Sequence, residues 1–191
     1  MRELAPLLAE DGIDLNNVGD MGALNRALQK ATERRNLELF TPVGARRDQA
    51  IALLILVVAA IANNETELAG RLLDSAQPES PGNIAADVSS CMGVALGLLD
   101  DWLSGQHPDV PKDVVDRVHL PTGHWFGERA AVNVLALARK GRAFGSLGSL
   151  ITRQGSHQLL AGSALALAAV VLAWSRSSGT PIGKLLPAVI R

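Results

Sequence analysis

Two histidines and a glutamate lie close together in the sequence and could bind a divalent metal ion. His124 follows five positions after His119, and Glu128 four positions after His124. A helix beginning near His124 would place that residue and Glu128 one turn apart on one face. Two imidazoles and a carboxylate suit Zn²⁺, and an open fourth position would hold an activated water. This set predicts a small metal-dependent hydrolase, although the spacing matches no established metal signature.

The alternative interpretation of the same residues is structural. A histidine in a loop is commonly a surface residue, and acidic residues are favoured at the start of a helix, where they offset the helix dipole. Glu128 would then stabilise the helix that follows it, with no metal bound. The sequence leaves both interpretations open.

A second group of residues could bind phosphate. Arg139, Lys140, Arg142 and Arg153 are the densest basic cluster of the C-terminal third, and three glycines lie among them. Backbone amides and guanidinium groups together can receive phosphates. Only Phe144 and Trp174 are aromatic after Phe126, so few side chains there could stack on bases. The cluster predicts contacts to a nucleic-acid backbone, with a solvated basic face as the alternative.

The charges are divided unequally along the chain. The last acidic residue is Glu128, and residues 129–191 contain eight Lys or Arg and no Asp or Glu. The overall net charge of −1 therefore hides an acidic part and a basic part. Such asymmetry indicates a polyanionic partner, an acidic half packed on a basic half, or subunits joined head to tail. The sequence does not choose among these three.

The composition favours an all-α fold. Apolar residues make up 48% of the chain and aromatic residues only 3%. Ala and Leu supply much of the apolar fraction, and both favour helices over strands. We expect an irregular multi-helix bundle of seven to nine helices in a single domain over residues 1–191, with weak internal linkers near 77–83 and 105–124.

Two segments, near 50–62 and 158–174, are apolar on all sides and should be the central helices. A helix without a polar face is either buried or in lipid. Each run is shorter than the roughly 20 apolar residues that a membrane span needs, so we expect core helices rather than spans. Leu56 and Leu167 are predicted to be fully buried.

Residues that favour helix ends indicate where several helices begin and stop. Asn64 and Ser156 are predicted N-caps, because their side chains can accept a hydrogen bond from a free backbone amide. Asn83 is a further candidate cap for the helix that runs to Trp102. Gly141 should end the helix over 126–140 in the left-handed conformation.

The single cysteine, Cys91, lies on an apolar helical face and is predicted to be inert packing. A chain with one cysteine forms no internal disulfide, which suits the cytoplasm. We expect a non-enzymatic, cytoplasmic interaction protein that self-associates, most simply as a homodimer, because its apolar content exceeds what a monomer of this size needs. The alternatives are the nucleic-acid-associated protein and the metal-dependent hydrolase described above.

Overall fold

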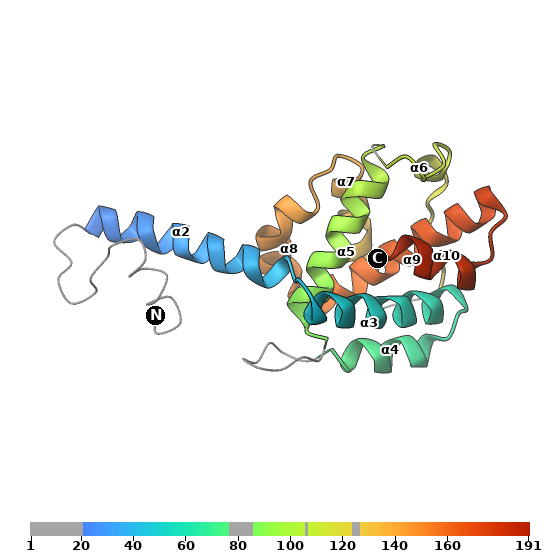
Figure 1. Ribbon diagram of the computed structural model, residues 1–191, viewed down its shortest axis with the longest axis horizontal. Coiled ribbons are helices and arrows are strands. Elements are labelled where there is room, and N and C mark those ends of the chain that lie inside the picture. Colours follow the sequence, from blue (N-terminus) through green and yellow to red (C-terminus); the bar gives the residue numbers. More distant parts are fainter. Residues whose placement is uncertain (1–20, 77–85, 106, 124–126) are drawn as a thin grey trace. The chain divides into compact units, whose positions relative to one another are not determined.

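The computed structural model describes residues 21–76, 86–105, 107–123 and 127–191, and it is helical as the composition predicts (Figure 1). Within these residues there are nine α-helices, one 3-10 helix and no strand. The helices are α2 (Met21–Phe40), α3 (Ala45–Ala62), α4 (Thr66–Asp74), α5 (Val88–Leu103), α6 (Val114–Arg117), α7 (Glu128–Ala138), η1 (Phe144–Ser146), α8 (Leu147–Gln154), α9 (Ser156–Ser178) and α10 (Ile182–Val189). The all-α, multi-helix prediction is confirmed.

The chain groups into two compact units, Met1–Thr41 and Pro42–Arg191. The described part of the first unit is α2 with the following Thr41. The second unit holds all the other helices. Of the two predicted linkers, 77–83 lies outside the described residues, and the described part of 105–124 is mostly irregular, with only the short α6 in it. The single domain over residues 1–191 stays a prediction.

The core of the second unit is built around α9. This helix of 23 residues packs against α3, α5 and α7, and every residue from Leu159 to Val171 is buried. The one hydroxyl in that stretch belongs to Ser163, which donates to the Leu159 carbonyl at 2.8 Å. The polar group is thus satisfied within the helix, so the surrounding contacts can be entirely apolar. Leu167 is fully buried, as predicted.

By length and composition α9 could also cross a membrane. It is the one described helix that meets both criteria, but 83% of its most apolar window is buried inside the protein. Helices at the centre of a folded core pass the same test, and this degree of burial is typical of them.

Two helices approach each other closely where the start of α7 meets the second turn of α9. A Cβ atom at Gly162 would lie 2.5 Å from the Cβ of Ala130 and 2.8 Å from the carbonyl oxygen of Gly127. A Cβ at Gly127 would in turn overlap the backbone of Gly162. Glycine at both positions lets α7 pack directly on the backbone of α9.

Helix α3 covers another side of α9, but it is itself covered on only part of its circumference. It contacts α4, α5, α9 and α10, and its residues Leu54, Val57, Val58 and Ile61 are buried. In Figure 1, α3 and α4 run side by side. The prediction for Leu56 is wrong: its side chain is 55% exposed, whereas Leu54, Val57 and Val58 on the other side of α3 are buried.

The predicted helix ends have mixed outcomes. Gly141 is left-handed, with φ 61°, immediately after the last turn of α7, as expected. Asn64 is not an N-cap; it lies in a left-handed turn with φ 64°, and Glu65 precedes α4. Ser156 is the first residue of α9 rather than its cap, because Gly155 with φ 79° makes the turn. Asn83 lies outside the described residues.

Candidate functional site

The three predicted metal ligands are only partly described. His119 is exposed in the segment that follows α6, and Glu128 is the exposed first residue of α7. His124 lies outside the described residues. Within the described part of the chain, no three His, Cys, Asp or Glu residues come together in a group that could hold a metal ion. The site formed by His119, His124 and Glu128 therefore stays a prediction.

The four predicted phosphate-binding residues are divided between different surfaces. Arg139 and Lys140 line a hollow of about 400 Å³ at the end of α7. Two carboxylates line the same hollow, those of Asp100 and Asp101, so its charge is mixed. Arg153 instead lines a separate hollow, and Arg142 lines neither. Nucleic-acid binding by these four residues stays a prediction.

One of the two carboxylates in that hollow has a structural role. Asp100, near the end of α5, accepts hydrogen bonds from the backbone amides of Ala143 at 2.8 Å and Phe144 at 2.9 Å. Those amides begin the turn that leads into η1, and helix starts leave such amides without an internal partner. Asp100 therefore fixes the chain after α7 against α5. Local sequence patterns do not indicate this pairing, because the two segments are 43 residues apart.

The hollow that Arg153 lines is more basic. It has a volume of about 500 Å³ and lies among α7, α8 and α9. Its lining residues are Arg129, Ala130, Asn133, Arg153, Gln154 and Gln158. Two guanidinium groups and three side-chain amides thus line the hollow, and no carboxylate is among them. Sequence reasoning missed Arg129 and all three amides, which are neighbours only in the folded chain.

The outer side of α3 is an exposed apolar face. Leu56 is its most exposed large side chain, Ala52 is also exposed, and Ile55 and Ala59 are half-buried. These four residues, which we term the α3 face, are spaced so that they lie on one side of the helix. Val132 on α7 is exposed to a similar extent, at 54%, but its exposed neighbours Asn133 and Arg129 are polar.

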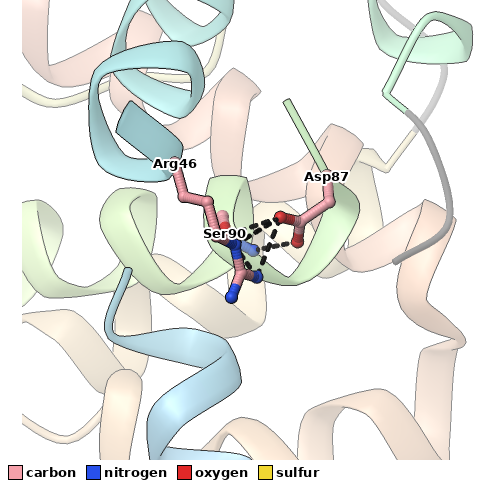
Figure 2. Close-up of polar contacts among 3 residues, drawn as sticks. All are labelled: Arg46, Asp87 and Ser90. Atoms are coloured by element: carbon pink, nitrogen blue, oxygen red, sulfur yellow. Dashed lines mark hydrogen bonds and ion pairs between the residues drawn. The ribbon is translucent and has the colours of Figure 1, made fainter. Parts of the chain in front are cut away.

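A buried polar cluster fixes the start of α3 against the start of α5 (Figure 2). Asp87 is the N-cap of α5, and its Oδ1 accepts a hydrogen bond from the backbone amide of Ser90 at 2.8 Å. Its Oδ2 accepts from the Ser90 hydroxyl at 2.7 Å and from Arg46 Nη2 at 2.9 Å. Arg46 Nη2 also donates to the Ser90 oxygen at 3.0 Å. Each of the three side chains therefore contacts the other two.

The charge of Asp87 is stabilised where it lies. Burial by itself raises the pKa of this carboxyl, but the hydrogen bonds from Ser90 and Arg46 and the charge of Arg46 together hold it below its ordinary value. The cluster therefore acts as an ionised N-cap that also joins two helices. It directs the inner side of α3 toward the core and leaves the α3 face outward.

The single cysteine has no sign of reactivity. Cys91 is fully buried in α5, and burial, with a smaller effect from the nearby charge of Asp87, raises its pKa to about 12. A thiol with so high a pKa is not a nucleophile near neutral pH. The predicted packing of Cys91 in the apolar core is confirmed, and its lack of reactivity stays a prediction.

Comparisons with known proteins add no relative from which a function could be transferred. The α3 face and the two hollows are therefore the features of the chain that bear on its function. No protein-family model, no curated protein sequence and no solved structure matches this chain.

Proposed function

We propose that the protein is a non-enzymatic, cytoplasmic interaction protein of the all-α class, which self-associates through the α3 face. The observation that carries this proposal is the 55% exposure of Leu56 within the apolar stretch 50–62 of α3. Large apolar side chains exposed singly are common, but a face of adjacent apolar residues marks an interaction site. A second copy of the chain is the partner for which the face is suited.

The order of side chains on the α3 face supports a two-fold contact. From one end it reads Ala52, Ile55, Leu56, Ala59, which is small, large, large, small, at intervals of three, one and three residues. The order of sizes and the intervals are the same from the other end. Two antiparallel copies of α3 would therefore place Ala52 against Ala59 of a second copy, and Ile55 against its Leu56. A two-fold interface needs this kind of self-complementary surface.

The small residues at the ends of the face favour a close helix pair. Alanines let two helix backbones approach, so that the larger side chains between them can interdigitate. Complete burial of one Leu side chain contributes roughly 1.5–3 kcal/mol. Association itself costs at least about 4 kcal/mol. Burial of Leu56 from both copies therefore only about offsets the cost of association. Ile55 and the neighbouring surface must also be buried, and we expect a moderate affinity.

The unequal distribution of charge along the chain can accelerate the association of two copies without stabilising the dimer that they form. Exposed ion pairs contribute only about 0–1 kcal/mol each, whereas complementary charges accelerate association. A dimer held by apolar burial should therefore survive roughly 0.5 M salt, where charges are screened beyond a few Å. A dimer held by charge should dissociate.

Light scattering of the full chain at micromolar concentration, at low and high salt, tests the proposal. We expect a dimer mass in both conditions, and a monomer mass for Leu56→Asp. Val132→Asp is the matched control, because Val132 has nearly the same exposure on a different helix. A monomeric wild type rejects self-association. A dimer that Leu56→Asp leaves intact places the interface elsewhere and rejects the α3 face.

A further inference from the structure

We propose that the hollow lined by Arg129, Asn133, Arg153, Gln154 and Gln158 binds the phosphate group of a small phosphate monoester. The proposal is independent of self-association, since none of these residues belongs to the α3 face. It also differs from binding of a nucleic acid by the basic cluster, because only Arg153 is shared with that cluster.

The charges lining the hollow are the first argument. Arg129 and Arg153 both line it, and neither guanidinium group makes a hydrogen bond or ion pair with the part of the chain that the structure describes. Two like charges in one hollow repel each other, and no carboxylate of the lining offsets them. A phosphate monoester carries a charge of about −1.5 to −2 near neutral pH, which matches two guanidinium groups.

The hydrogen-bonding groups are the second argument. Arginine is planar and can donate two parallel hydrogen bonds to the oxygens of a phosphate. Gln158 Oε1 accepts from the Gly127 backbone amide at 3.1 Å, which fixes this side chain and leaves its N–H groups free to donate. Asn133 lies one turn after Arg129 on the same side of α7, so it can donate from the same wall.

The third argument is an unsatisfied polar atom. Gln154 Oε1 is enclosed and has no hydrogen-bond partner in the described structure. Enclosed polar atoms are nearly always hydrogen-bonded, so this oxygen indicates that a donor is missing. Gln154 also lines the hollow, so a small rotation of its side chain would bring this oxygen within reach of a hydroxyl of the ligand's organic part.

The shape of the hollow sets the size of the ligand. A volume of about 500 Å³ is within the range of sites for small organic molecules, and it exceeds what a phosphate ion alone would fill. Gly155, with φ 79°, turns the chain sharply between α8 and α9, so Arg153 and Gln154 before it and Gln158 after it line one hollow. The polar lining favours a ligand whose organic part carries hydroxyl groups.

Titration calorimetry of the full chain with inorganic phosphate and with glycerol 3-phosphate tests the proposal. We expect both to bind, the ester more tightly. Arg129→Gln and Arg153→Gln should each weaken binding about ten-fold or more, since hydrogen bonds to a charged group are being removed. Arg153→Lys keeps the charge but loses the paired donors, and should give an intermediate loss. Arg142→Gln is the matched control and should bind like the wild type.

Three results would overturn the proposal. The first is no binding of either phosphate at millimolar concentration by a wild type whose helical circular dichroism is intact. The second is an equal loss in Arg142→Gln and Arg153→Gln, which would indicate diffuse attraction by basic charge. The third is binding of a DNA duplex that Arg142→Gln weakens and Arg129→Gln does not, with no binding of glycerol 3-phosphate.

Discussion

Gly127 and Gly162 lie against each other, and neither position has room for a side chain. Gly162 lies within α9, where an alanine Cβ would meet Ala130 and the backbone of Ala131 at 2.5 and 2.7 Å. Gly127 is in addition left-handed, with φ 74°, which side chains other than glycine disfavour. The packing of α7 on α9 thus depends on these two residues, and it can be tested by substituting either of them.

Gly162→Ala should destabilise the protein by roughly 1–3 kcal/mol or more, because overpacking forces the two helices apart. Urea unfolding followed by circular dichroism measures the loss. Gly97→Ala is the matched control: Gly97 is also within a helix, α5, and a Cβ there would meet nothing within 4 Å. That variant should be stabilised by roughly 0.4–1 kcal/mol. Equal effects of both substitutions would show that α7 and α9 are not in close contact.

Leu167→Ala and Leu56→Ala should differ strongly in their effect on stability. Leu167 is fully buried, and its truncation should cost about 2–5 kcal/mol at any protein concentration. Leu56→Ala should cost less than about 0.5 kcal/mol in dilute protein, where Leu56 faces water. At higher concentration its cost should grow, because the dimer buries Leu56 and binding stabilises the folded state. A large cost of Leu56→Ala in the most dilute sample would mean that a single chain buries this side chain.

Asp87→Asn should lower stability at neutral pH and have less effect in acid. Asparagine is still an N-cap, so the substitution removes mainly the charge that faces Arg46. The folded state holds the pKa of Asp87 below its ordinary value of 3.8, so ionisation stabilises the fold. This stabilisation is complete above about pH 4 and is lost as the pH falls through the lowered pKa.

The measurement is the free energy of unfolding in urea, for wild type and Asp87→Asn, at pH 7 and at successively lower pH. The difference between the two proteins should narrow below about pH 4. Asp116→Asn, at an exposed carboxylate of α6, is the control and should change stability little at either pH. A difference between wild type and Asp87→Asn that stays constant into acid would mean that the carboxylate charge is not stabilising.

Cys91 should not react with a thiol reagent while the protein is folded. Its pKa of about 12 leaves almost no thiolate at pH 8, and the side chain is fully buried. Ellman's reagent should therefore release colour only when urea is added, and then one equivalent per chain. Rapid reaction in buffer alone would show that α5 opens locally or that the thiol is accessible.

The sequence predicted the helical class and the central helix well. Residues Leu159 to Trp174 have no polar side, and outside a lipid bilayer such a helix is hidden from water only when other helices surround it. The left-handed conformation of Gly141 was predicted correctly because the signal is local: two basic residues, Arg139 and Lys140, are followed by a glycine. Both predictions depend on periodicity and on neighbours in sequence.

The features that sequence reasoning missed depend on neighbours in space. The exposure of Leu56 could not be read from the sequence, because the apolar stretch 50–62 gives no sign of which of its sides lacks a partner. The cap of α5 depends on Arg46, which lies 41 residues before Asp87. Arg129 and Arg153 belong to different helices, and only the packing of α7 and α8 on α9 gives them a common hollow. His119 and Glu128 are described, but His124 is not, so the metal prediction is still to be tested.

The position of α9 in the chain has a consequence for how the protein is made. Its partners α3, α5 and α7 all precede it, so they leave the ribosome before the helix that joins them. Until α9 emerges, their inner surfaces have no common partner and stay open to aggregation or to chaperones. Chains truncated within α9 should therefore accumulate as insoluble or chaperone-bound material, although most of the helices are already complete.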